Sequence, residues 1–363
     1  MITSTEIDKL RSIRAPGETV LSLYVGVPLN PAGLRELHAQ ASDLIREAAS
    51  SGPGLVSAED TRVACEAVTA HARQNLGCTL GVFSCGELGL HEVVPLPGGL
   101  AERAVLAVRP HVRPLLAAVQ RYPDHRIVII DHRHVWLLAV TADRIQTVAW
   151  AADTGSSSRG FGGWYGLDAY SANQRVAELD RRHYRDAAAI LDQASRDSGP
   201  QPLVVGGDAE SIQHLLAILP QAVRDSYAGC FAADPHALTP SKARDLAAPV
   251  VARCISGRER QLVEQIAAGA AGKPAALGIH ACLAAVNADE ATLLLIPDRG
   301  VVPGYYCERC EVLSLTSDEC CDWGAASRAV PDLLEEMALR TLHAGGEVVC
   351  TRELPCGVAA RLR

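Results

Sequence analysis

The feature that most constrains this chain is a glycine-rich segment at residues 155–166, which contains five glycines and three serines. It has neither helical nor strand periodicity, so the sequence predicts an exposed loop. Phe161, Trp164 and Tyr165 lie within it. Exposed aromatic rings are costly in water unless they contact something, which favours a binding loop over a simple linker. The segment lacks the Gly-Lys-Ser/Thr ending of a P-loop and the spacing of a dinucleotide fingerprint.

Three apolar blocks before this loop predict consecutive strands, because they are rich in β-branched residues and separated by short polar segments. They are residues 127–130, 135–140 and 145–150. Short connections suit antiparallel neighbours, so we expect a meander. Asp131, His132 and His134 fall in the first connection, where they can be imagined as acid and base. Hairpin turns favour such polar residues in any case.

A long helix is predicted after the loop. Ser171 and Gln174 have the spacing of a capping box, which would place the start of the helix at Ser171. Apolar residues, with His183 among them, recur at spacings of three and four and give one buried stripe. The opposite face carries Arg175, Arg181, Arg182 and Arg185. This face is either solvated and paired with nearby carboxylates or in contact with a polyanion, and the sequence leaves both alternatives open.

The predicted strands, the loop, the helix and a later strand at residues 203–207 resemble the central domain of a known family. It is the bacterial and archaeal family related to eukaryotic-type class-1 release factors and Pelota. Residues 20–25 resemble its amino-terminal strand, and residues 276–296 resemble part of its carboxy-terminal domain. The resemblance implies the ribosome as partner and an α/β (α+β) fold of three domains. The expected domains are residues 1–122, 123–240 and 241–363.

Active members of that family carry a Gly-Gly-Gln or Gly-x-x-Gln loop that enters the peptidyl-transferase centre and promotes hydrolysis of peptidyl-tRNA. Ester hydrolysis needs a positioned water and donors for the developing oxyanion. Here Gly166 stands where the glutamine is expected, and no glutamine occurs between Gly155 and Asn173. Gln174 is the nearest one. The capping box explains it better than catalysis does, so it is only a fallback catalytic candidate.

The run Trp164-Tyr165-Gly166, followed by Asp168, is similar to a Balon-type branch of ribosome-hibernation factors. Those factors occupy the A site of idle ribosomes, some together with elongation factor Tu. This resemblance implies a catalytically silent stress factor that contacts rRNA, with tRNA as a further candidate partner. The implied ribosome- or RNA-binding residues are Gly160, Phe161, Gly162, Gly163, Trp164, Tyr165, Gly166, Arg175, Arg181, Arg182 and Arg185.

Two other functions stay open. One is a peptidyl-tRNA hydrolase, or a release and rescue factor, in which the loop backbone or Gln174 replaces the missing glutamine. The other is an interaction or stress protein without a ribosomal role, in which the arginines and the aromatic loop residues are ordinary surface. Salt-insensitive behaviour and failure to bind RNA would support the second of these.

The net charge of −8 argues against a protein that coats nucleic acid. Any RNA contact must be a local patch, and we expect no DNA partner. Residues 1–14 lack the apolar core of a signal peptide, and no stretch reaches the roughly 18 apolar residues that cross a bilayer. We therefore expect a cytoplasmic protein with no membrane partner.

Most of the twelve cysteines stand singly in apolar surroundings, which predicts reduced thiols rather than structural disulfides. A cysteine-rich segment at residues 305–324 contains Cys307-x-x-Cys310 and the adjacent pair Cys320 and Cys321. Four thiolates can hold zinc tetrahedrally, but an adjacent pair does so less comfortably. The resemblance implies a degenerate zinc-ribbon-like insertion, with structural zinc and redox-inert thiols as alternatives. No other cofactor is expected.

Overall fold

The computed structural model describes residues 4–15, 19–51, 56–141, 144–152, 167–269, 274–317, 327–352, 354 and 357–363. The chain forms two compact units. Unit 1 combines Met1–Tyr122 with Glu259–Arg363, and unit 2 is Pro123–Arg258. The three domains expected from the sequence stay a prediction beside this division into two units. Residues 1–122 share a unit with the last part of the chain, and unit 2 continues past residue 240.

The first part of unit 1 contains a sheet covered on both faces. Its elements are α1 (Ser4–Ser12), β1 (Val20–Gly26), η1 (Pro31–Arg35), α2 (Leu37–Ser51), α3 (Ala58–Ala72), β2 (Thr79–Cys85), η2 (Gly86–Leu88), β3 (Leu90–Leu96), β4 (Arg103–Ala107) and α4 (Arg113–Arg121). The strand order is β3-β2-β1-β4, and all pairs are antiparallel. Leu21 and Leu23 pack in the core with α2 and α3, whereas Val20 and Tyr24 pack with α1 and α4. This alternation follows from the two-residue period of a strand.

The second part of unit 1 contains two sheets. Its elements are β10 (Ala275–Leu277), α9 (Ile279–Asn287), β11 (Ala291–Pro297), β12 (Gly304–Tyr306), β13 (Leu313–Ser314), β14 (Arg328–Val330), α10 (Leu333–His343), β15 (Glu347–Thr351) and β16 (Ala359–Leu362). The larger sheet has the order β10-β16-β11-β15, and the smaller has the order β13-β12-β14. Helix α4 joins the two parts of unit 1, because Leu115 and Leu339 belong to the same core cluster.

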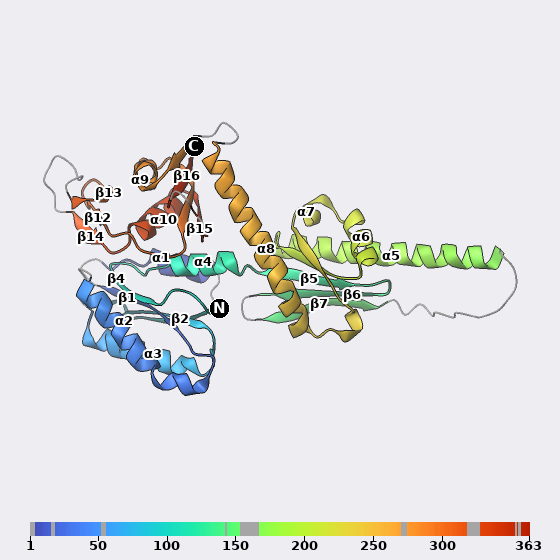
Figure 1. The fold of residues 1–363 in the computed structure, drawn as a ribbon, viewed down its shortest axis with the longest axis horizontal. Coiled ribbons are helices and arrows are strands. Elements are labelled where there is room, and N and C mark those ends of the chain that lie inside the picture. Colours follow the sequence, from blue (N-terminus) through green and yellow to red (C-terminus); the bar gives the residue numbers. More distant parts are fainter. Residues whose placement is uncertain are drawn as a thin grey trace. The chain divides into compact units, whose positions relative to one another are not determined.

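Unit 2 is built on one five-stranded sheet (Figure 1). Its elements are β5 (His125–Ile130), β6 (His134–Val140), β7 (Ile145–Ala152), α5 (Leu167–Ser198), β8 (Leu203–Gly207), α6 (Ala209–Ile218), α7 (Gln221–Arg224), β9 (Tyr227–Ala232), η3 (Pro235–Ala237) and the first part of α8 (Pro240–Ala267). The strand order is β7-β6-β5-β8-β9. Strands β5, β6 and β7 pair antiparallel, which confirms the predicted meander. Strands β8 and β9 continue the sheet parallel to β5.

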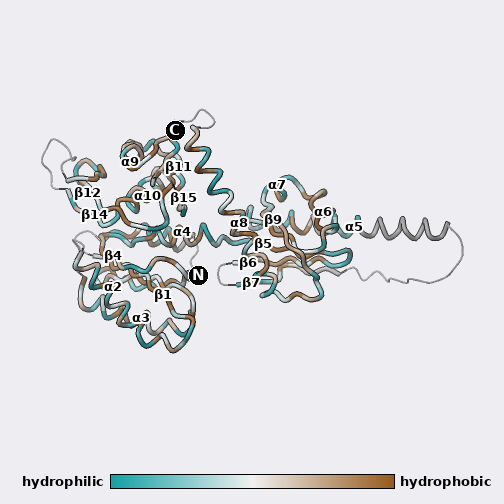
Figure 2. Tube along the Cα trace, viewed as in Figure 1, coloured by the Kyte–Doolittle hydropathy of each residue, from teal (hydrophilic) through white to brown (hydrophobic). Residues whose placement is uncertain are grey.

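Helices cover both faces of the unit 2 sheet. Val128 and Ile130 pack with α5 and α6, whereas Ile127 and Ile129 pack with α8. A strand covered on both sides has no solvent-facing positions, which explains its continuous apolar run. Residues 127–130 of β5 are accordingly all apolar, and Figure 2 shows the hydropathy of each described residue along the chain. The combination of sheets and helices confirms the expected α/β fold class.

The start of α5 differs from the prediction. The helix begins at Leu167, so Ser171 and Gln174 both lie inside it, and the predicted capping box is wrong. A serine three residues before a glutamine also occurs inside helices, and local spacing alone does not separate the two cases. The Asp208 carboxylate caps α6, because it accepts a hydrogen bond from the Ser211 amide at 2.9 Å. None of the described helices combines the length and apolar character that a bilayer crossing requires.

Candidate functional site

The predicted loop residues, Gly160 to Gly166, lie outside the described residues, so their role stays a prediction. Gln174 and Arg175 lie in the first half of α5. The finding that Gln174 is not a capping residue removes the structural explanation that the sequence offered for it. Its place inside a helix, rather than in the glycine-rich loop, still differs from the place of the catalytic glutamine that the resemblance implies.

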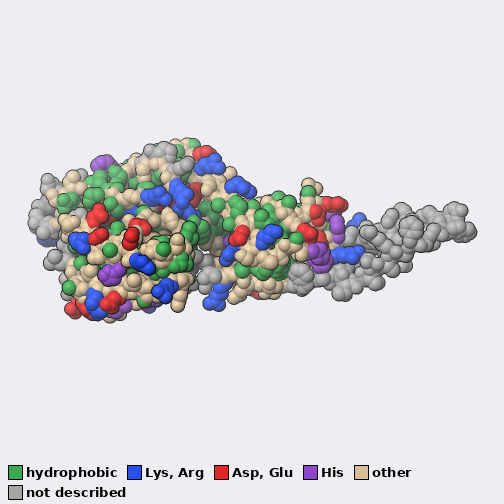
Figure 3. Space-filling model, turned by 60° about the horizontal axis from the view of Figure 1, so that its bottom comes forward, with side chains coloured by type: hydrophobic (Ala, Val, Ile, Leu, Met, Phe, Trp, Pro, Cys, Tyr) green, Lys and Arg blue, Asp and Glu red, His purple; other side chains and the backbone are tan. Residues whose placement is uncertain are grey.

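The second half of α5 has the two faces that its sequence predicts. His183, Tyr184, Ala187 and Leu191 are buried against the sheet. Arg181, Arg182 and Arg185 are exposed on the other side. Figure 3 shows basic, acidic and histidine side chains gathered on one part of the surface of unit 2. The structure therefore presents three arginines to solvent on one helix.

The parallel strands of unit 2 bring several polar residues to one edge of the sheet. Strands β5, β8 and β9 point the same way, so their carboxyl ends meet at that edge. Asp131 follows β5, Asp208 follows β8, and His236 lies in η3 shortly after β9. We call this the carboxyl edge. In open α/β sheets, ligands bind preferentially outside the carboxyl ends of the strands.

Asp131 is the best-anchored side chain of the carboxyl edge. Its Oδ1 accepts hydrogen bonds from the amides of Arg133 and His134, each at 2.7 Å. His134 Nδ1 lies 3.1 Å from both carboxylate oxygens. Partial burial disfavours the charge of Asp131, but the hydrogen bonds from these two amides and from His134 outweigh it and lower its pKa. Asp131 is therefore held as a carboxylate.

A hydrogen-bonded chain connects α5 to the same edge. His183 Nε2 donates to the Asp131 carbonyl oxygen at 3.1 Å. The Tyr184 hydroxyl donates to Ser211 Oγ at 3.1 Å, and Ser211 Oγ donates to Asp208 at 2.6 Å. The helix with the exposed arginines is thus fixed to the ends of β5 and β8.

The sequence identified only part of this arrangement. It grouped Asp131, His132 and His134 in one turn, and the structure shows Asp131 and His134 in contact there. His132 Nδ1 instead lies 3.3 Å from the Tyr184 hydroxyl. His236 was missed because it is distant in sequence. The order of the parallel strands, which brings the end of β9 near the end of β5, was the signal that could have identified it.

The four cysteines of the predicted zinc site are only half described. Cys307 is buried and Cys310 is half-buried in the turn between β12 and β13. The Cys307 amide donates to the Val312 carbonyl at 3.0 Å, which closes this turn. Cys320 and Cys321 lie outside the described residues. A zinc ion on these four thiolates stays a prediction.

Residues 110–253 match the family model described as bacterial archaeo-eukaryotic release factor family 10. The matched segment includes all five strands of the unit 2 sheet and both helices that flank the carboxyl edge, α5 and α6. No curated protein sequence matches the chain.

Several solved structures resemble the chain at low identity. The archaeal translation termination factor aRF1 is 15% identical, covers 100% of this chain and 98% of its own, and has a TM-score of 0.26. Archaeal Pelota, in a model with ABCE1 on the ribosome, is 16% identical over 99% and 94%, with a TM-score of 0.42. Dom34 of S. cerevisiae, a translation termination-like factor, is 10% identical over 79% and 80%, with a TM-score of 0.40. These likenesses are too weak to carry an argument about function.

Proposed function

We propose that the chain is a release-factor-like translation factor that binds the ribosome, because residues 110–253 match the model of bacterial archaeo-eukaryotic release factor family 10. The observation that carries the proposal is the family match itself, because it covers the sheet, the loop segment and α5 together. We also propose how the protein acts on the ribosome. The protein occupies the A site of idle ribosomes and leaves the peptidyl-tRNA intact.

The arrangement of α5 supports contact with ribosomal RNA. The glycine-rich segment at residues 155–166 leads directly into this helix, and Arg181 lies 14 residues beyond its start. At about 1.5 Å per residue, that separation is roughly 21 Å along the axis. A loop that enters the ribosome can therefore act at one depth, while the arginines contact phosphates at another. Exposed arginines suit this role because a guanidinium pairs with a phosphate through two hydrogen bonds.

The absence of a loop glutamine supports a factor without hydrolytic activity. Residues 155–173 contain no glutamine, and Gly166 offers only backbone groups. Losing one positioned donor to a developing oxyanion typically lowers a rate by about 10²- to 10³-fold. We therefore expect hydrolysis to be slower by about that factor than with the glutamine in place. The enzymatic alternative would need the loop backbone, or Gln174 from inside α5, to replace the missing donor.

We predict that Arg181→Glu combined with Arg185→Glu weakens ribosome binding and flattens its dependence on salt. Each cation that neutralises a phosphate releases counterions, so removing two such contacts lowers the slope of log K against log salt by roughly one to two. Co-sedimentation with vacant ribosomes over a series of KCl concentrations measures both quantities. The thermal midpoint should stay nearly unchanged, because both side chains are exposed.

The matched control is Arg46→Glu combined with Arg196→Glu. These arginines are also exposed, and each has a local ion pair with an acidic residue on its own helix. The charge change is the same, so a general electrostatic effect would appear equally in both double variants. Equal salt slopes for the two would exclude the α5 face as the RNA contact.

A further inference from the structure

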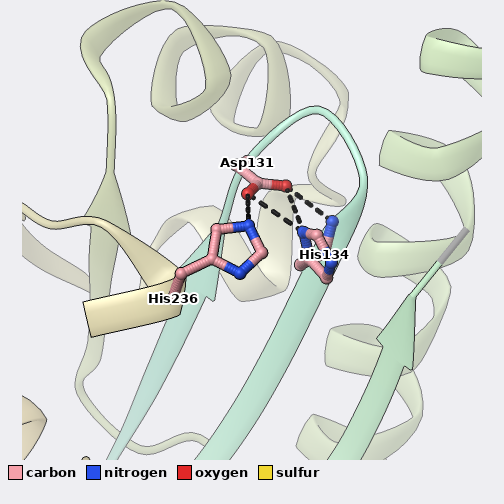
Figure 4. Close-up of side chains that lie close together, drawn as sticks. All are labelled: Asp131, His134 and His236. Atoms are coloured by element: carbon pink, nitrogen blue, oxygen red, sulfur yellow. Dashed lines mark hydrogen bonds and ion pairs between the residues drawn. The ribbon is translucent and has the colours of Figure 1, made fainter. Parts of the chain in front are cut away.

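Two histidines and one aspartate converge at the carboxyl edge of unit 2. The ligand atoms that Asp131, His134 and His236 can offer all lie within 4.8 Å of one another. His134 Nδ1 is 3.1 Å from the Asp131 carboxylate, and His236 Nε2 is 4.0 Å from it. Figure 4 shows both imidazole rings turned toward the carboxylate from opposite sides. We propose that these three residues bind a divalent transition-metal ion.

The donor set decides the class of ion. Two imidazole nitrogens and one carboxylate oxygen suit zinc, iron, cobalt or nickel, whereas Mg²⁺ and Ca²⁺ prefer oxygen ligands throughout. Three protein ligands leave at least one coordination position for water or for an atom of a ligand. The site is therefore of the open type, unlike the closed four-thiolate site predicted at residues 305–324.

The surrounding contacts fix the Asp131 side chain and the backbone of His236 before an ion arrives. The Asp131 carboxylate is fixed by the two amides of its own turn, and its carbonyl accepts from His183. The amide of His236 donates to the Asp234 carboxylate at 2.9 Å, which fixes the start of η3. Such contacts behind the ligands orient them and raise the affinity of a metal site.

A turn function explains only part of this cluster. An aspartate that accepts amide hydrogen bonds after a strand is an ordinary turn residue, and a histidine three positions later can pair with it locally. His236 needs another explanation, because it comes from a segment more than 100 residues later and turns its ring to the same carboxylate. Its ring centroid is 4.6 Å from that of His134, at a steep angle rather than stacked. The ligand atoms of both rings still lie within 4.8 Å of the Asp131 carboxylate and of each other.

Access to the cluster is open on one side. The side chains of Asp131 and His134 are 22% and 19% exposed, whereas that of His236 is 68% exposed. An ion can enter from solvent past His236, and a small rotation of this side chain shortens the 4.0 Å gap. A bound ion would join the end of β5 to the segment after β9, two strands that lie on either side of β8. Binding should therefore stabilise unit 2.

The test uses the full chain without an affinity tag, stripped by chelator and titrated with Zn²⁺ by calorimetry. The background carries Cys307→Ser and Cys310→Ser, so that the predicted thiolate site does not contribute. We expect one ion to bind and to raise the thermal midpoint, with no such effect of Mg²⁺. His134→Gln and His236→Gln should each weaken Zn²⁺ binding by more than about tenfold.

His214→Gln is the matched control. His214 also lies in unit 2, is 59% exposed and pairs with Glu210, but it is not part of the three-residue cluster. The His214→Gln variant should therefore bind Zn²⁺ with the same affinity as the background chain. The absorption spectrum of bound Co²⁺ gives a second readout, since nitrogen and oxygen ligands produce no sulfur-to-cobalt charge-transfer band. Unchanged Zn²⁺ affinity in His236→Gln would overturn the proposal, as would an equal loss in His214→Gln.

Discussion

Replacing Asp332 with alanine should destabilise unit 1 by about 3 to 5 kcal/mol, the largest effect we expect from any single change. Asp332 and Arg113 form an ion pair at 2.5 Å, and each side chain is only 1% exposed. His111 Nε2 lies 3.0 Å from the same carboxylate. The Asp332 carboxylate also accepts from the Leu334 amide and so caps α10. Its removal leaves a buried guanidinium without a counter-charge.

The effect should also depend on pH. Burial disfavours the charge of Asp332, but the hydrogen bond with His111 and the charge of Arg113 outweigh it and lower its pKa. A carboxyl group with a lowered folded pKa stabilises the fold above its unfolded pKa of about 3.9. That contribution is lost as the pH falls through the folded value. The difference between Asp332→Ala and the unmodified chain should therefore be full at neutral pH and shrink in acid.

Urea unfolding at neutral pH and in acid measures this prediction. Asp43→Ala is the matched control, because Asp43 pairs with Arg46 at 2.6 Å but both side chains are largely exposed. An exposed pair contributes about 0 to 1 kcal/mol. A loss below about 1 kcal/mol for Asp332→Ala at neutral pH would show that the buried network does not hold unit 1 together.

Gly207→Ala should destabilise unit 2 by about 3 kcal/mol, near the upper end of overpacking effects. Gly207 ends β8 and pairs with Ile130 at the end of β5. A Cβ atom built on Gly207 would overlap the carbonyl oxygen of Ile130, which belongs to the backbone and cannot move aside alone. The change should therefore separate the ends of these two strands and displace Asp131 and Asp208, the residues that follow them.

The same glycine-to-alanine substitution at Gly257 should stabilise the protein instead of destabilising it. Gly257 lies inside α8, and a Cβ atom added there meets no atom within 4 Å. Alanine is favoured over glycine in a helix interior by roughly 0.5 to 1 kcal/mol, so Gly257→Ala should raise stability. Thermal unfolding of both variants tests this prediction: the midpoint should fall for Gly207→Ala and rise for Gly257→Ala. Two midpoints that move in the same direction would contradict the close approach of β5 and β8.

Local patterns predicted local structure well. The apolar blocks at residues 127–130 and 135–140 became β5 and β6, because a strand's character is visible in a few consecutive residues. The start of α5 was wrong because a plausible capping pattern at Ser171 lies inside the helix.

Contacts between residues that are far apart in the sequence could not be predicted from these local patterns. No local signal in the sequence indicates that Leu115 and Leu339 share one core cluster, in a unit formed by both ends of the chain. The candidate site shows the same limit. Asp131 and His134 are three residues apart and were grouped at once, whereas His236 joins them only through the order of parallel strands. The family resemblance could be stated from motifs because it depends on the order of segments along the chain.

The most direct test of the central claim is a single experiment on vacant ribosomes and on ribosomes that carry labelled peptidyl-tRNA in the P site. The purified chain is sedimented with each, and released peptide is measured in the same tubes. A chain lacking residues 160–166 serves as the control and should bind more weakly with an unchanged thermal midpoint. The account predicts binding to both kinds of ribosome without release of peptide above background. Release of the labelled peptide would contradict the silent A-site occupant, and failure to bind either ribosome would contradict the proposed function itself.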